Sequence, residues 1–256
     1  MKIGNRGDLD DLLWHFFAGI HELLLELAGR VPDDLLTYLR TALVDGDLAI
    51  IPDTVAGSAA TLGISLRPAN LELLQMMVGE RDLAGADLVA VAEDIPATDH
   101  RFAPVPAGAL ASGGSRIPAS LDLSGCGADL TDLPDSLASL ADLAEELTDL
   151  VDEAVVMEVP DHECVIGLWR AWRFGPAGPP RDARRVFLVE VAPDTLAWDL
   201  EARIRSWIVD TLGDGSSDIE VYWAGDELTP YHRAVRANAA LLWARGRGAD
   251  PERVKG

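Results

Sequence analysis

The chain has 256 residues, of which 48% are hydrophobic and 25% charged, and its formal net charge is −22 at pH 7. This composition is typical of a folded globular protein and excludes an intrinsically disordered one. The acidity is concentrated in residues 1–160, which carry 8 basic and 28 acidic side chains. A nucleic-acid duplex or an anionic membrane would be repelled by this part of the chain.

The first 80 residues predict a helical unit. Residues 8–30 show the clearest pattern, with acids in the first turn, Gly29 as the stop and apolar side chains over roughly 220° of arc. A helix so widely apolar must be surrounded, and we expect its own domain to bury it, with an oligomer interface as the alternative. Three further helices are predicted at 32–47, where Pro32 takes the first helical position, at 51–64 and at 68–79.

The middle of the chain gives a weaker signal. Residues 87–94 fit a short strand, and 102–120 are rich in Pro, Gly, Ser and Ala, which favours a linker or a long loop. An acidic helix is predicted at 129–154. We therefore expect a helical domain at 1–103, a loop-rich linker at 104–130 and an α/β sandwich domain at 131–256 that begins with the acidic helix.

The last part of the chain alternates strands and helices. Strands are predicted at 153–160, 164–174, 184–193 and 218–225, and helices at 194–212 and 229–246. The strands on either side of the 194–212 helix are far enough apart in sequence to run parallel. The predicted fold class is α+β: a helical N-terminal region followed by a C-terminal α/β sandwich of about four strands with two helices.

Motifs for common chemistries are missing from the sequence. It contains no GxxxxGK[ST], no GxGxxG after a predicted strand, no HExxH and no GxSxG. We therefore expect no cofactor and no metal site, and we favour a non-catalytic protein over an enzyme.

One short segment nevertheless concentrates potential ligands and acid–base groups. His162, Glu163 and Cys164 are consecutive, and a nucleophilic Cys164 would need a base such as His232. A turn at 160–163 followed by a buried cysteine explains the same residues, and we favour that interpretation. The alternative function is small-ligand binding or catalysis near His162, Cys164 and His232.

Arginine and tryptophan residues give a second set of candidates, for binding. They are Trp169, Arg170, Trp172, Arg173, Arg184, Arg185, Arg233 and Arg236. Arginine is suited to recognition of carboxylate or phosphate. In a strand, however, alternation places Trp169 and Arg173 on one face and Arg170 and Trp172 on the other, so that no stacking platform for nucleic acid forms. Outside this strand, we expect the arginines to pair with the acidic N-terminal region, within the chain or between subunits; they are Arg181, Arg184, Arg185, Arg233 and Arg236. Within the strand, an arginine on either face can lie near an aromatic ring.

The expected cellular compartment is inferred from features that the sequence lacks. Two cysteines, Cys126 and Cys164, provide no disulfide framework, the N-terminus lacks a secretory pattern, and no apolar run reaches transmembrane length. The excess of Arg over Lys indicates a GC-rich bacterial genome. We therefore expect a cytoplasmic adaptor subunit of a larger bacterial assembly, such as a defence or biosynthetic system. It would bind another protein chain, or itself, through an apolar helical surface, and it would bind neither nucleic acid nor a membrane.

Overall fold

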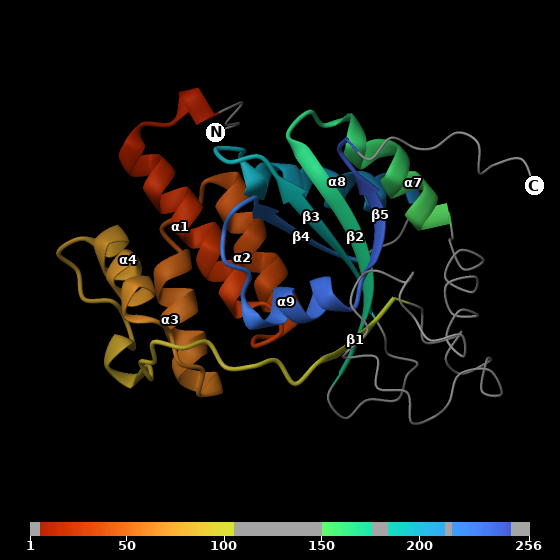
Figure 1. Cartoon of the computed structure of the whole chain (residues 1–256). Helices are drawn as coiled ribbons and strands as arrows, with labels where there is room; N and C mark the ends of the chain where they lie inside the picture. Colours follow the sequence, from red (N-terminus) through yellow and green to blue (C-terminus); the bar gives the residue numbers. More distant parts are fainter. Residues whose placement is uncertain (1–5, 105–149, 176–183, 213–216, 247–256) are drawn as a thin grey trace, which may run out of the picture. The chain divides into compact units, whose positions relative to one another are not determined.

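The computed structural model describes residues 6–104, 150–175, 184–212 and 217–246 (Figure 1). These residues form seven α-helices and one five-stranded mixed sheet. Helices fill the N-terminal part and strands the C-terminal part, so the predicted α+β class is confirmed. Apart from Pro104, the linker at 104–130 lies outside the described residues, as does most of the predicted helix at 129–154, and the domain boundaries stay a prediction.

The described residues divide into two compact units. The first contains the residues up to His100 together with Asp194–Arg203 and Glu227–Arg233. The second contains Arg101–Pro193, Ile204–Asp226 and the residues from Ala234 onward. Neither unit is continuous in sequence, because the chain returns to the first unit twice after it has entered the second.

The four predicted N-terminal helices are confirmed as α1 (Asp11–Leu27), α2 (Asp33–Asp45), α3 (Ile51–Leu62) and α4 (Pro68–Val78). Their ends follow local chemistry. The carboxylate of Asp10 accepts a hydrogen bond of 2.8 Å from the backbone N–H of Leu13 and so caps α1. Gly46 ends α2 in the left-handed conformation, at φ 74°. Pro32 precedes α2 as its cap and is not in the first turn as predicted, since its ψ of 139° is extended.

Helix α1 is buried within the first unit. Its inward side chains include Phe17, Ile20 and Leu24, which are almost completely shielded from solvent. Trp198 at the start of α8 (Ala197–Leu212) stacks on Phe17 with ring centroids 5.4 Å apart. The chain itself therefore surrounds this apolar helix, as we expected, and each such side chain stabilises the unit by about 1.5–3 kcal/mol. Leu12 is the exception, at 58% exposure.

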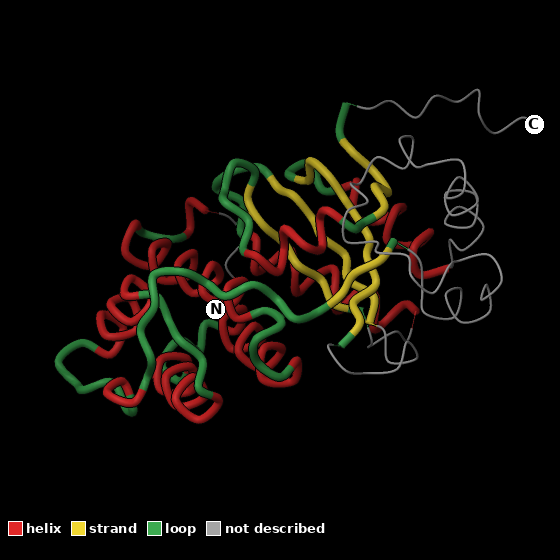
Figure 2. The backbone as a smooth tube through the Cα atoms, turned by 60° about the horizontal axis from the view of Figure 1, so that its bottom comes forward, coloured by secondary structure: helices red, strands yellow, loops and turns green. Residues whose placement is uncertain are grey.

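The strands, yellow in Figure 2, form one sheet, and all of its residues belong to the second unit. Its strands are β1 (Arg101–Ala103), β2 (Val165–Phe174), β3 (Arg184–Val191), β4 (Asp218–Trp223) and β5 (Ala240–Ala244). The central strand β2 pairs antiparallel with β1, β3 and β5. Strands β3 and β4 run parallel, with Leu188 opposite Glu220. This parallel pair on either side of α8 was predicted.

Several predicted elements are wrong in type. Residues predicted as the strand 153–160 belong to α7 (Leu150–Glu158) and a following 3-10 turn (Val159–Asp161). A short apolar run does not distinguish helix from strand by itself, and here the buried residues Val155 and Val159 follow the helical spacing of four. Residues 87–94 form a 3-10 turn (Ala86–Leu88) and one isolated bridge from Leu66 to Val91 in place of a strand.

The predicted helix at 229–246 is also divided. It consists of α9 (Pro230–Ala237) and strand β5. The side chain of Asn238 donates a hydrogen bond of 2.9 Å to the carbonyl of Ala234 and closes the last turn. The next residues pair with β2, so tertiary hydrogen bonding overrides the helical propensity of their alanines and leucines. Strand β1 was not predicted at all.

Candidate functional site

The most conspicuous sequence feature, Trp169 to Phe174, is a buried part of β2. Arg170 is 1% exposed and forms an ion pair with Asp152 of α7, and it also donates to the carbonyl of Pro104 at 2.9 Å. Arg185 of β3 lies 3.6 Å from the same Asp152 carboxylate, and its guanidinium stands over the Trp172 ring at 4.8 Å. These side chains form an internal charge cluster on one face of the sheet.

The opposite face of β2 has a second internal cluster. The guanidinium of Arg236 lies 3.5 Å from the centroid of the Trp169 ring, a cation–π contact. Tyr222 of β4 faces the same side; its burial, and secondarily the charge of Glu190, raise its pKa to about 12. Arg173 pairs with Asp218 at 3.2 Å. Alternation along β2 therefore separates the two tryptophans as expected, and both sets of arginines have partners inside the chain.

The remaining candidates lie in different places. Arg184 begins β3 and is half-buried. His162 Nε2 is 3.9 Å from Glu158, and Cys164 is a half-buried free thiol just before β2. Glu163 lies between them in the second unit, whereas His232 belongs to the first. His232 is buried, with Nδ1 at 2.7 Å from the Thr229 hydroxyl.

A metal site is not apparent in these surroundings. The described part of the chain contains no group of three or more His, Cys, Asp or Glu side chains arranged to hold a metal ion. Catalysis or ligand binding at His162, Glu163, Cys164 and His232 stays a prediction.

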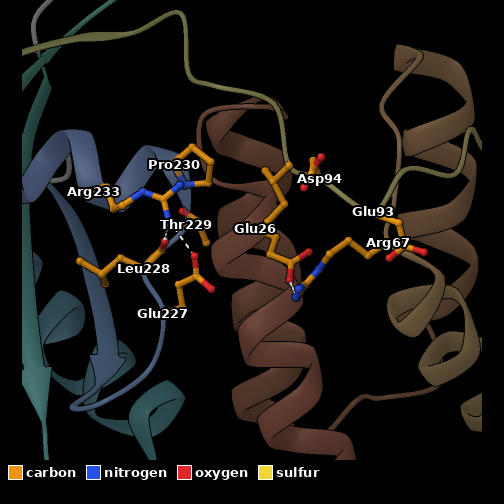
Figure 3. Close-up of a pocket in the computed structure, with 10 residues that line it drawn as sticks. Glu26, Arg67, Glu93, Asp94, Glu227, Leu228, Thr229, Pro230 and Arg233 are labelled. Atoms are coloured by element: carbon orange, nitrogen blue, oxygen red, sulfur yellow. Dashed lines mark hydrogen bonds and ion pairs between the residues drawn. The ribbon is translucent and has the colours of Figure 1, made fainter.

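A polar pocket of about 230 Å³ opens in the first unit (Figure 3). Glu26 of α1 forms one wall; it is 5% exposed and accepts hydrogen bonds from Arg67, the residue before α4, and from Asn70. Arg233 forms the opposite wall and donates to Glu227 at 3.2 Å and to the carbonyl of Leu228 at 2.7 Å. The other lining residues are Glu93, Asp94, Ile95, Thr229 and Pro230.

An apolar groove of about 540 Å³ runs along α4 in the same unit. Its lining residues are Leu71, Glu72, Gln75, Met76, Gly79, Leu83 and Ala86. Met76 is 51% exposed, and Leu88, two residues beyond Ala86, is 72% exposed. Met76 is thus a large apolar side chain in contact with solvent within the lining of the groove.

Sequence reasoning did not identify either hollow as a site. The polar pocket draws on four segments that are distant in the chain, so no local pattern marks it. The groove had a detectable signal. The apolar residues of 68–79 lie on more than one side of the helix: Leu73 and Leu74 are buried, whereas Met76 points elsewhere and is exposed.

Comparison with protein families, curated protein sequences and solved structures gives no significant match. Across the described residues, no helix is both long and apolar enough to cross a membrane.

Proposed function

We propose that this protein is a non-catalytic, cytoplasmic interaction subunit of a bacterial assembly, and that another protein chain binds in the groove along α4. The observation that carries the proposal is the 51% exposure of Met76, which lines this groove. Exposed apolar side chains that border a concave surface mark interaction sites more often than isolated ones do. Most of the apolar side chains of α1 are shielded within its own unit, with Leu12 as the exposed exception, so we place the interaction surface elsewhere.

Polar contacts made by one lining residue, Gln75, and by the adjacent loop hold the groove in shape. The side-chain amide of Gln75 donates to the carbonyls of Gly79 and Arg81 and accepts from the backbone N–H of Leu83. The carboxylate of Asp53 on α3 accepts from the Arg81 guanidinium and from the backbone N–H of Ala84. A loop fixed in this way loses little conformational entropy when a partner binds, which favours affinity.

The test is co-purification from the native host with a variant that changes only this surface. Met76→Asp places a charge in the groove, and Leu12→Asp is the matched control, since Leu12 is a similarly exposed apolar residue on α1. We expect a stoichiometric partner with the wild type and with L12D, and its loss with M76D. Equal recovery of the partner with M76D, or a wild-type protein that is a monomer without a partner, contradicts the proposal.

Small-ligand binding in the polar pocket is the second candidate function. The observation in its favour is the buried Nε of Arg67, which has no hydrogen-bond partner among the described residues. With the carboxylates of Glu93 and Asp94 also in the lining, the pocket offers both guanidinium donors and anionic acceptors. A small zwitterion such as an amino acid carries the two complementary groups.

This second function predicts a rise in the unfolding temperature with amino acids at millimolar concentration. Asp94→Asn should remove the rise, and Asp99→Asn, an exposed aspartate that does not line the pocket, should retain it. No rise with any amino acid would exclude the candidate ligand class.

A further inference from the structure

We propose that the occupant of the α4 groove is a basic, amphipathic helix of a different protein. This inference rests on the proposed interaction function and adds the chemistry of the partner. Two observations carry it: the apolar floor of the groove and the sign of the charges around it.

The floor requires an apolar stripe on the partner. Leu71, Met76, Leu83 and Ala86 present hydrocarbon to the groove. Helix α4 has 11 residues and is therefore about 16 Å long. A partner helix of about three turns matches this length and would place apolar anchors at positions i, i+3, i+4 and i+7.

The rim requires positive charge on the rest of that helix. Residues 71–88 contain the acids Glu72, Glu80, Asp82 and Asp87, all exposed, and a single base, Arg81. Arg81 already forms an ion pair with Asp53 at 2.7 Å. Glu72 lines the groove, and each of the other three acids is next to a lining residue in the chain. The rim formed by these residues therefore has an excess of negative charge, and lysine or arginine residues flanking the apolar stripe of a partner would be attracted to it.

The same charges disfavour the other occupants. A second copy of this chain carries a net charge of −22, so electrostatic repulsion opposes contact between two acidic surfaces. The chain's own segment 129–149 has a leucine-rich pattern but contains seven acidic residues and no basic one. Like charges across an interface are destabilising, so both are poorer occupants than a basic helix from another protein.

Peptide binding to the full-length protein tests the proposal. The probe is a dye-labelled helical peptide of about four turns with leucines at i, i+3, i+4 and i+7 and lysines on its polar face. One control peptide replaces every lysine with glutamate, and a second keeps the lysines but scrambles the leucines. Fluorescence anisotropy should show binding of the first peptide at least about tenfold tighter than of either control. The difference from the glutamate peptide should shrink at high salt, because salt screens the charges.

Protein variants locate the binding. M76D should lower the affinity for the basic peptide by at least about tenfold, whereas L12D should leave that affinity unchanged. The double variant Glu72→Lys and Asp87→Lys should reverse the preference toward the glutamate peptide. Equal binding of the amphipathic and scrambled basic peptides, or an affinity unaffected by M76D, would overturn the proposal.

The outcomes separate this inference from the function on which it rests. Co-purification that depends on Met76 together with no preference for the basic peptide leaves the interaction function in place and overturns only the partner's chemistry. Failure of both experiments overturns the interaction function as well. Concentration-dependent dimerisation abolished by M76D would replace the foreign partner with a second copy.

Discussion

The buried ion-pair cluster of β2 makes a quantitative prediction about stability. Asp152→Asn keeps the size of the side chain and removes the negative charge that faces Arg170 and Arg185. Both members of the Asp152–Arg170 pair are 1% exposed, so water cannot replace the lost carboxylate without opening the structure. Removal of one partner from a buried pair costs about 3–5 kcal/mol, which is a large part of a typical total of about 5–15 kcal/mol.

Urea unfolding followed by tryptophan fluorescence measures this loss. A decrease of about 3 kcal/mol corresponds to a midpoint lower by about 1–1.5 M, for a slope of about 2–3 kcal/mol/M. The matched control is Asp199→Asn, which removes a more exposed i,i+4 pair with Arg203 and should cost less than about 1 kcal/mol. The double variant D152N/R170M should be more stable than D152N, because it also removes a buried positive charge.

Two results would refute this reasoning. One is a cost below about 1 kcal/mol for D152N, similar to that of the exposed control. The other is a double variant that is no more stable than the single one, which would mean that charge is not the cause of the loss.

Three further predictions concern other parts of the chain. Gly29→Ala should destabilise the protein more than Gly46→Ala. Both glycines have a positive φ, but only at Gly29 would an added Cβ lie 2.5 Å from the Tyr231 ring. Equal decreases in the thermal unfolding temperature would contradict this prediction. Ultraviolet titration should show an ionisation near pH 12 that Tyr222→Phe removes, and the stability due to neutral Tyr222 should be lost as the pH rises from its ordinary pKa of 10 toward 12. The hydrogen bond from the backbone N–H of Ala84 lowers the pKa of Asp53. Wild type should therefore have a higher melting temperature than Asp53→Asn at neutral pH, and this difference should vanish as the pH falls below 3.8. A difference that persists at low pH would exclude the charge of Asp53 as its cause.

Local rules predicted the helices well because the signals that end a helix are themselves local. Acidic first turns and glycines such as Gly46 mark the boundaries without information from the rest of the chain. Two of the errors, at the end of the chain and at β1, fall where pairing across the sheet decides the conformation. Residues 240–244 have helical propensity but lie beside β2, and β1 has only three residues, too few for any periodic pattern.

The candidate binding residues show what charge alone does not reveal. Arginines near tryptophans suggest a recognition surface when they are read along the sequence, yet Arg170 and Arg173 lie in the interior with Asp152 and Asp218 as partners. Alternation along the strand predicted that these arginines lie on opposite faces, but the sequence does not specify that each is paired with a carboxylate.

This internal use of arginine has a consequence for the helical unit. Many basic side chains are committed to local pairs, and the acids at the rim of the α4 groove have only Arg81 beside them in sequence, itself paired with Asp53. Such an arrangement contributes little to folding, because exposed carboxylates of like sign repel one another. It does favour one class of binding partner, because a basic helix is attracted to each exposed carboxylate and an acidic helix is repelled by it. The negative charge from which we expected no nucleic-acid binding is thus also the property that would select the protein partner.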